Sequence, residues 1–293
     1  MPRKLAIVLG GGGARGALQV GALRALFESG YTPSLLVGTS IGAVNAAFLA
    51  IHGPNLDGVA ALEDAWQDAA SADLLPAGYL WLAMRSLFNR PVYDPYHRMR
   101  DFFLSHGLTE DLRFGDIQGL RLAVVASDLS SGCPLIYGED PQKTVLEGLL
   151  ASTALPPWVR PLNSSGHVLL DGGVVSTLPV EPAMRLGAGE IIALDLIDPR
   201  GAAGGDSSLG LLANRLIFSV EQRTADLECA LAQARRIPLR RLTLHSEEPV
   251  AAWDFTHTRE LIDYGYTLAS REIAAWEPPH RSWWSRWREK SPN

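Results

Sequence analysis

Four consecutive glycines follow a short apolar run near the start of the chain, in the stretch LAIVLGGGGARG of residues 5–16. A continuous apolar run of this length is typical of a buried parallel strand, and helix-forming residues follow at 17–28. A strand, a turn and a helix in this order predict the first unit of a parallel sheet. Because glycines leave backbone N–H groups bare, the turn is suited to an anion. That anion is either a nucleotide phosphate or an oxygen that becomes negative during a reaction.

The same order is repeated directly afterwards. Residues 34–37 form a second candidate strand, GTSIG follows at 38–42, and the small apolar run AVNAAFLA predicts a buried helix. Further candidate strands lie at 120–126, 168–170 and 191–196. We therefore expect an α/β fold of three layers, in which a mostly parallel central sheet has helices on both faces.

We expect a single α/β domain over residues 5–275, with a long insertion at 55–115. The insertion is rich in apolar and aromatic residues and is broken by prolines, so it is a candidate lid or substrate wall. Packing as ordinary helices against the sheet is an equal alternative. Further on, residues 209–236 predict one long helix or a helical pair.

The tail at residues 276–293 differs in composition from the rest of the chain. It interleaves aromatic with basic side chains: Trp283, Trp284, Trp287, Arg281, Arg286, Arg288 and Lys290. This composition suits contact with anionic lipid headgroups, although tryptophans also pack back onto a domain. No apolar run reaches the ~18 residues of a transmembrane helix. We expect a cytoplasmic protein, with peripheral contact at the membrane as the minority hypothesis.

Charge and cysteine content argue against several classes of protein. The net charge of -6 disfavours a dedicated nucleic-acid binder. The two cysteines, Cys133 and Cys229, are far apart and form no CxxC, so we expect neither a disulfide framework nor a zinc site. Carboxylates with the spacing of a calcium loop are also absent from the sequence, and we expect no metal and no cofactor. The sequence leaves the oligomeric state open.

Both nucleotide interpretations of the glycine run lack a residue that they require. Residues 11–16 satisfy G-x-G-x-x-G, but a dinucleotide site also needs a carboxylate at the end of the next strand. That strand ends in Val37-Gly38-Thr39-Ser40 without one. A triphosphate-binding loop needs Lys-Ser or Lys-Thr after the glycines, and neither dipeptide is present there.

GTSIG matches the G-x-S-x-G pattern of a nucleophile elbow, here after the second strand. A sharp turn from strand to helix exposes the hydroxyl of Ser40, and the flanking Gly38 and Gly42 give the turn room. Both glycine motifs follow consecutive strands, at the sheet edge where open α/β sheets bind ligands. The N–H groups of residues 11–13 can then face the substrate oxygen. Losing one oxyanion donor typically costs about 2–4 kcal/mol of barrier, and we interpret the glycine run as an oxyanion hole.

A serine nucleophile needs a base. His245 and His257 have the chain order of a Ser-Asp-His triad, but an elbow after only two strands fits the α/β-hydrolase fold badly. Three carboxylates follow candidate strands: Asp128, Asp171 and Asp195. Each can also serve as a turn former or helix cap. Asp171 ranks first because the two glycines after it let the backbone fold away and free the carboxylate to approach another group.

Four motifs in this order, GGGARG, GTSIG, ASTALPP and DGG, resemble the patatin-like phospholipase family of serine acyl hydrolases. The resemblance runs from residue 5 to about 195. It implies a dyad without histidine, with Ser40 as nucleophile and Asp171 as base. It also implies that the amides of Gly11, Gly12 and Gly13 are the oxyanion donors.

The resemblance implies supporting roles for further residues. The supporting set is Arg15, Gly16, Gly38, Gly42, Gly172 and Gly173. Arg15 would order the glycine loop, while Asp128 and Ser152 would have structural roles. One departure is visible after DGG: the family commonly has an asparagine before a proline, and here Ser176 and Thr177 occupy that stretch. Altered local support is the expected consequence.

These residues predict a lipid acyl hydrolase of phospholipase A or lysophospholipase type, acting on lipid or other acyl esters. A carboxylesterase or thioesterase with a soluble substrate is the alternative. A nucleotide-binding regulatory protein that uses the glycine loop is a further alternative, of a different class. No nucleic-acid partner is expected.

Overall fold

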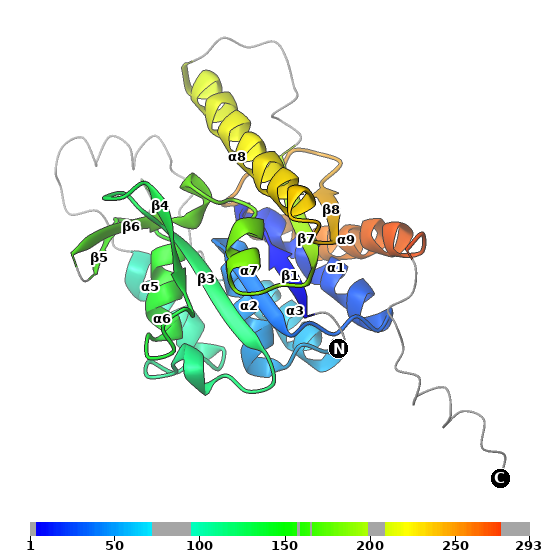
Figure 1. Cartoon of the computed structure of the whole chain (residues 1–293), viewed down its shortest axis with the longest axis horizontal. Coiled ribbons are helices and arrows are strands. Elements are labelled where there is room, and N and C mark those ends of the chain that lie inside the picture. Colours follow the sequence, from blue (N-terminus) through cyan, green and yellow to red (C-terminus); the bar gives the residue numbers. More distant parts are fainter. Residues whose placement is uncertain (1–3, 72–94, 157–158, 165, 199–208, 277–293) are drawn as a thin grey trace.

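The computed structural model describes residues 4–71, 95–156, 159–164, 166–198 and 209–276. Its centre is an eight-stranded sheet of order β5-β6-β3-β2-β1-β7-β8, with β4 paired to β3 as a branch (Figure 1). The strands are β1 Leu5–Leu9, β2 Leu35–Thr39, β3 Arg121–Asp128, β4 Cys133–Tyr137, β5 Leu162–Ser164, β6 His167–Asp171, β7 Glu190–Ile197 and β8 Leu239–His245. The neighbouring strands β3-β2-β1-β7-β8 are all parallel to one another. By contrast, β4 and β6 lie antiparallel to β3.

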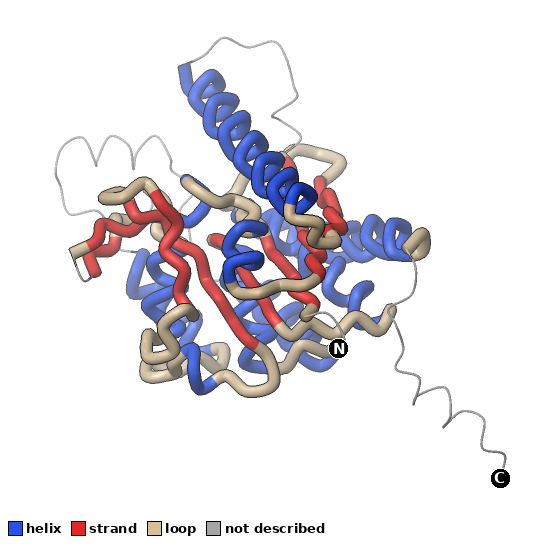
Figure 2. Tube along the Cα trace, viewed as in Figure 1, coloured by secondary structure: helices blue, strands red, loops and turns tan. Residues whose placement is uncertain are grey.

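Helices cover both faces of this sheet, as the tube in Figure 2 shows. The α-helices are α1 Ala17–Glu28, α2 Ile41–His52, α3 Leu56–Ser71, α5 Pro95–Ser105, α6 Val145–Ser152, α7 Val180–Arg185, α8 Leu209–Ala234 and α9 Thr258–Ile273. Short 3-10 helices are η1 Gly13–Gly16, η2 Phe114–Asp116, η3 Gly172–Val174 and η5 Phe255–His257. This arrangement confirms the predicted α/β fold of three layers with a mostly parallel sheet.

Alternation along β1 divides the core in two. Ile7 and Leu9 are fully buried in a cluster with α1, α2, α3, α6 and α9 on one face of the sheet. Ala6 and Val8 point to the other face, where α7 and α8 pack. In Figure 1 these two helices lie in front of the sheet, and α1, α2 and α3 lie behind it. Strands buried on both faces explain why β1 reads as a continuous apolar run.

The insertion predicted at 55–115 is described at its two ends. Its first part is α3, which packs against α1 and α2, and a later part is α5, which contacts α6. Residues 72–94, at the centre of the predicted lid, lie outside the described residues, as do 277–293 of the tail. At the start of the tail, the ring of Trp276 packs edge-on against Tyr31, with 5.9 Å between centroids. Within the described ranges, no helix combines the length and apolarity needed to cross a membrane.

Candidate active site

Ser40 occupies the sharp turn between β2 and α2. The strand ends at Thr39, the helix begins at Ile41, and Ser40 itself has φ 55 and ψ -124. Non-glycine residues rarely adopt this backbone region, which costs on the order of 1–3 kcal/mol and is found mainly at functional sites. The geometry is that of a nucleophile elbow placed after the second strand of the chain.

The two glycines of GTSIG are required by close backbone contacts. A Cβ atom on Gly38 would lie 2.3 Å from the carbonyl oxygen of Gly42. A Cβ atom on Gly42 would lie 2.2 Å from the carbonyl oxygen of Leu9, at the end of β1. The first turn of α2 therefore presses directly on the ends of two strands, and no larger side chain fits at either position.

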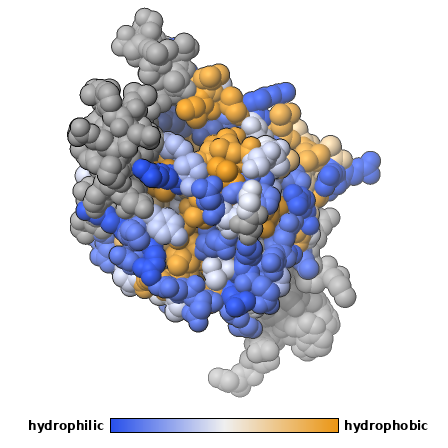
Figure 3. All heavy atoms as spheres, turned by 90° about the vertical axis from the view of Figure 1, so that its left-hand side faces the viewer, coloured by the Kyte–Doolittle hydropathy of each residue, from blue (hydrophilic) through white to orange (hydrophobic). Residues whose placement is uncertain are grey.

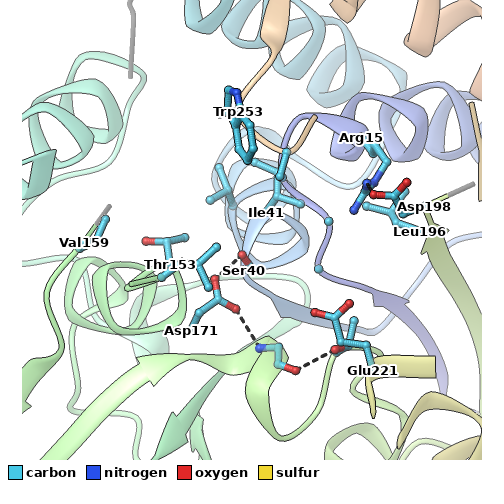
Figure 4. A pocket seen from close by; sticks show the side chains of 18 of the residues that line it. Arg15, Ser40, Ile41, Thr153, Val159, Asp171, Leu196, Asp198, Glu221 and Trp253 are labelled. Carbon is cyan, nitrogen blue, oxygen red and sulfur yellow. Dashed lines mark hydrogen bonds and ion pairs between the residues drawn. The ribbon is translucent and has the colours of Figure 1, made fainter. Parts of the chain in front are cut away.

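Strand register brings Asp171 to Ser40. Thr39 at the end of β2 pairs with Val125 of β3, and the next residue of β3, Ala126, pairs with Asp171 of β6. The Oγ of Ser40 donates a hydrogen bond to Oδ2 of Asp171 at 2.5 Å (Figure 4). These two residues are thus in direct contact although the chain places them on separate motifs.

The environment of the Asp171 carboxyl suits a base that works near neutral pH. Its side chain is buried, and burial raises the pKa of Asp171 to about 6. Hydrogen bonds from the Ser40 hydroxyl and from the Gly173 amide, at 2.8 Å to Oδ1, act in the opposite direction. Such a carboxylate is more basic than an exposed aspartate and remains ionised at pH 7 and above.

Ser152, at the end of α6, supports the elbow through its side chain. The amide of Ser40 donates to Oγ of Ser152 at 2.9 Å. The same hydroxyl donates to the carbonyl oxygen of Val125 at 2.6 Å. Ser152 is fully buried, so this bridge has no competition from water. The geometry agrees with the structural role expected for this serine.

The glycine loop differs from expectation at one residue. The amide of Gly11 donates to the carbonyl oxygen of Thr177 at 2.9 Å, so it is not free to hold a substrate oxygen. This corrects the expectation that Gly11 is an oxyanion donor. On the far side of the loop, the amide of Ala14 donates to Ala252 at 2.7 Å. Between them, the amides of Gly12 and Gly13 donate to no protein atom among the described residues, and both residues line the cavity.

Buried polar side chains fix this loop. Arg15 forms an ion pair with Asp198, just beyond β7, and both side chains are largely buried. The side-chain amide of Gln19 donates to the carbonyl oxygen of Gly10 at 2.9 Å. The side-chain amide of Asn45 donates to the carbonyl oxygen of Gly16 at 3.1 Å. Sequence reasoning singled out Arg15 but missed Gln19 and Asn45, since a polar residue inside an apolar helix carries no local sign of its partner.

The other strand-end carboxylates do not reach Ser40. Asp128 accepts hydrogen bonds from Ser131, from the Nδ1 atom of His167 at 2.9 Å and from the Ser130 amide, which hold the pKa of Asp128 at about 2. Asp195 forms an ion pair with Arg241 at 2.7 Å. Among the described histidines, none lines the cavity. No group of three His, Cys, Asp or Glu side chains within the described ranges could hold a metal ion.

The stretch after Asp171 replaces the family's asparagine with hydroxyl side chains. Thr177 Oγ1 donates to the carbonyl oxygen of Gly173 at 2.8 Å, while the Ser176 hydroxyl donates to Glu228 of α8 at 2.6 Å. The carbonyl oxygen of Ser176 in turn accepts from Thr39 Oγ1 at 2.8 Å. This stretch therefore ties the Asp171 turn to β2 and to α8.

Ser40 and Asp171 open into a cavity of about 510 Å³. Its larger wall is apolar and comes from α2, α3 and α5: Val44, Phe48, Leu62, Trp66, Met99, Phe102 and Phe103. In Figure 4, Thr153 and Val159 lie to one side of Ser40, and Arg15, Asp198 and Glu221 lie to the other. The described ends of the 55–115 insertion thus contribute to the cavity wall.

Glu221 of α8, like Asp198, is a charged cavity residue that the sequence did not indicate. Burial raises the pKa of Glu221 to about 7; the guanidinium of Arg15 lowers it, and the carboxylates of Asp171, Asp198 and Asp195 raise it further. Nothing in the sequence distinguishes this glutamate from the other polar residues of a long helix, because its position depends on where α8 crosses the sheet.

A patatin-like phospholipase family model matches residues 7–184. Patatin-like phospholipase domain-containing protein 7 of Rattus norvegicus is 28% identical over 199 residues, and neuropathy target esterase sws of Drosophila melanogaster is 30% identical over 202. Each of these alignments covers 66% of this chain but 13% of the relative, so the chain spans a small part of their length.

The crystal structure of VipD from Legionella pneumophila aligns with 94% of this chain and 67% of that chain, at a TM-score of 0.49 and 15% identity. The family model covers more than half of this chain and includes the glycine loop, the elbow and the Asp171 turn. The chain therefore belongs to the patatin-like phospholipase family.

Proposed function

We propose that the protein is a lipid acyl hydrolase of phospholipase A or lysophospholipase type, with Ser40 and Asp171 as its catalytic dyad. The observation that carries the proposal is the 2.5 Å hydrogen bond from the Ser40 hydroxyl to the Asp171 carboxylate, beside a largely apolar cavity. The strained elbow and the raised pKa of Asp171 support it further, because both are expected of a nucleophile and its base.

In the proposed reaction, Oδ2 of Asp171 takes the proton of Ser40 as Oγ attacks the ester carbonyl carbon. The carbonyl oxygen becomes negative and accepts hydrogen bonds from the amides of Gly12 and Gly13. The tetrahedral intermediate collapses, the C–O bond to the alcohol breaks, and Asp171 passes its proton to the leaving oxygen. Asp171 then takes a proton from water as the water oxygen attacks the acyl carbon. When the bond between that carbon and Ser40 Oγ breaks, Asp171 returns the proton to Ser40 and the carboxylic acid is released.

The apolar wall supports a long acyl chain as the substrate group. Aromatic and aliphatic side chains of α2, α3 and α5 line the cavity next to Ser40, with Trp66 and Phe103 almost fully buried. Each methylene moved from water to such a wall contributes about 0.8 kcal/mol. A small soluble ester would use little of this surface, which favours a lipid over the substrates of a general carboxylesterase or thioesterase.

Exposed apolar side chains beside the cavity support contact with a lipid surface. Leu216, Ile217 and Val220 of α8 are 65%, 57% and 50% exposed, and all three line the cavity. Figure 3 shows hydrophobic patches on one face of the molecule, next to polar surface. A surface of this kind next to a substrate entrance is typical of an interaction site. The predicted contact through the tryptophan-rich tail concerns residues outside the described ranges.

A fluorophosphonate probe tests the dyad. We expect a covalent adduct on Ser40, located by peptide mass spectrometry, which is absent in Ser40→Ala and forms far more slowly in Asp171→Asn. Circular dichroism establishes that both variants are folded. Failure of the folded wild-type protein to react, with and without detergent, would contradict the proposal.

A series of p-nitrophenyl esters from acetate to palmitate separates the two hydrolase hypotheses. A lipid hydrolase should show kcat/KM rising with acyl length, because the cavity wall contributes binding energy for each methylene. A flat or falling series would favour a soluble ester as substrate. The nucleotide alternative has less support, since the amides of Gly11 and Ala14 are already bonded to carbonyl oxygens.

A further inference from the structure

Glu221 has no hydrogen-bond donor within the part of the chain that the structure describes. Two helical turns further along α8, Glu228 is bonded by the Ser176 hydroxyl at 2.6 Å and by the Glu181 amide at 2.7 Å. Glu221 instead faces the cavity: its Oε1 would lie 3.9 Å from a methyl group built on Gly173. A partly buried carboxyl without a partner is costly unless a ligand supplies one.

The charges around the cavity leave Glu221 without a cation of its own. The charged side chains that line it are Arg15, Asp171, Asp198 and Glu221. The one guanidinium among them is engaged by Asp198. Two carboxylates of this lining are left without a cation: Asp171, which accepts a hydrogen bond from Ser40, and Glu221, which accepts none within the described residues.

The layout of the cavity suggests which end of the substrate lies near the carboxylate of Glu221. If Ser40 attacks the ester, as the proposed function requires, the acyl chain occupies the apolar wall built by α2, α3 and α5. Figure 4 places Glu221, Arg15 and Asp198 on the side of Ser40 away from Thr153 and Val159, and we assign the alcohol portion to that side. An ester whose alcohol carries a positive charge would bring Glu221 its missing partner.

We propose that Glu221 is a specificity-determining residue that binds an ammonium group on the alcohol portion of the ester and disfavours anionic alcohol portions. Opposite charges at such a site discriminate between partners through attraction on one side and repulsion on the other. The preference depends on ionised Glu221 and therefore strengthens as pH rises through the pKa of about 7. Asp171, Asp195, Asp198 and Arg15 face the same region, so the contribution of Glu221 must be isolated by substitution.

Binding to a catalytically inactive protein provides the test. In the Ser40→Ala background, the dissociation constants of decyltrimethylammonium and decyl sulfate are measured at pH 8.5 by tryptophan fluorescence, below micelle-forming concentrations. Trp66 and Trp253 line the cavity and supply the signal. We expect the ammonium probe to bind at least ~10-fold more tightly than the sulfate, a ratio equivalent to about 1.4 kcal/mol.

Two further substitutions decide whether Glu221 sets this ratio. Glu221→Gln in the same background should bring the two dissociation constants to within ~3-fold of each other. Asp226→Asn is the matched control, because Asp226 is on the same helix but pairs with Arg241 at 2.6 Å and does not line the cavity. It removes the same charge and should keep the ratio.

An unchanged ratio in Glu221→Gln, or an equal loss in Asp226→Asn, would overturn the inference. At pH 5.5 the ratio should fall in the protein that retains Glu221 and change less in Glu221→Gln. Hydrolysis of p-nitrophenyl decanoate by the protein with intact Ser40 is measured in parallel. If the protein hydrolyses this ester but shows no charge preference in binding, only the proposed role of Glu221 is wrong. If it shows a Glu221-dependent preference but no hydrolysis, the ammonium site stands and the proposed function is wrong.

Discussion

Ser152 holds the backbone of Ser40 in place: its hydroxyl accepts from the Ser40 amide at 2.9 Å and donates to the carbonyl oxygen of Val125 at 2.6 Å. Replacing Ser152 with alanine removes both of these hydrogen bonds. We expect Ser152→Ala to lower the free energy of unfolding by about 1–3 kcal/mol. Urea denaturation measures this change. Ser105→Ala is the control and should change stability by less than ~0.5 kcal/mol, because the Ser105 hydroxyl is exposed where it contacts the carbonyl oxygen of Phe102 and the ring of His106.

Esterase activity should depend on the ionisation of Asp171. In the proposed reaction Asp171 is the general base, which works only when it is deprotonated, and its pKa is raised to about 6. We expect kcat/KM to fall about tenfold per pH unit below that value and to level off above it. Asp171→Asn should lose at least ~10³-fold and show no such inflection. A wild-type profile that stays flat between pH 5 and 8 would exclude Asp171 as the base.

The same carboxyl affects stability with a defined sign. Its pKa in the folded protein, about 6, exceeds the ordinary value of 3.8, so the folded state binds the proton more tightly. The resulting stabilisation is complete below pH ~4 and is lost as pH rises through 6. Relative to wild type, Asp171→Asn should therefore be more stable at pH 8 than at pH 4, by at most roughly 3 kcal/mol. Denaturant titrations at the two pH values measure this difference, and a difference of opposite sign would contradict the raised pKa.

Backbone strain at Ser40 predicts an unusual ranking of two variants. Alanine must keep φ 55 at the elbow, whereas glycine adopts it without a steric penalty. We expect Ser40→Gly to be more stable than Ser40→Ala by about 1 kcal/mol. At the exposed helical residue Ser219, the order should reverse, with glycine about 1 kcal/mol less stable than alanine. Equal stability of the two Ser40 variants would show that the elbow relaxes when the serine is removed.

The exposed apolar face of α8 should contribute to lipid binding. Exposed Leu216 and Ile217 each lose about 1.5 kcal/mol of favourable transfer if they become polar. We expect Leu216→Gln with Ile217→Gln to reduce vesicle co-sedimentation at least ~10-fold. Leu129→Gln is the control, since Leu129 is 53% exposed but does not line the cavity. Deleting residues 277–293 tests the tail separately. If only this deletion reduces vesicle co-sedimentation, the tail and not α8 makes the lipid contact.

The sequence predicted the bounds of helices and strands best where those bounds are set by residues adjacent in the chain. β1 and α1 have the expected bounds, because an apolar run stops at the glycines and a helix stops at Glu28, two residues before Gly30. β8 was not predicted, since Arg240 and Arg241 interrupt its apolar pattern. Those arginines pair with Glu190 and Asp195 of β7, and such partners are invisible in the local sequence.

The candidate site shows the same division. Motif order was enough to propose Ser40 and Asp171 together, and strand register explains how they meet. Sequence could not rank the glycines of the loop, because they are chemically identical. Only the position of the Thr177 carbonyl oxygen separates Gly11 from Gly12 and Gly13. Glu221 was missed because its location depends on the path of α8 over the sheet.

The pairing of β1 with β7 means that a fragment of this chain needs β7 to keep both edges of β1 paired beside the site. The stretch that identifies the family ends at residue 184, before β7 begins at Glu190. A chain that stopped there would leave one edge of β1 unpaired, next to the glycine loop, and would strip α9 from α1. The family-model match therefore ends before β7, and a fragment cut at residue 184 would lack the strand that pairs with β1 beside the glycine loop.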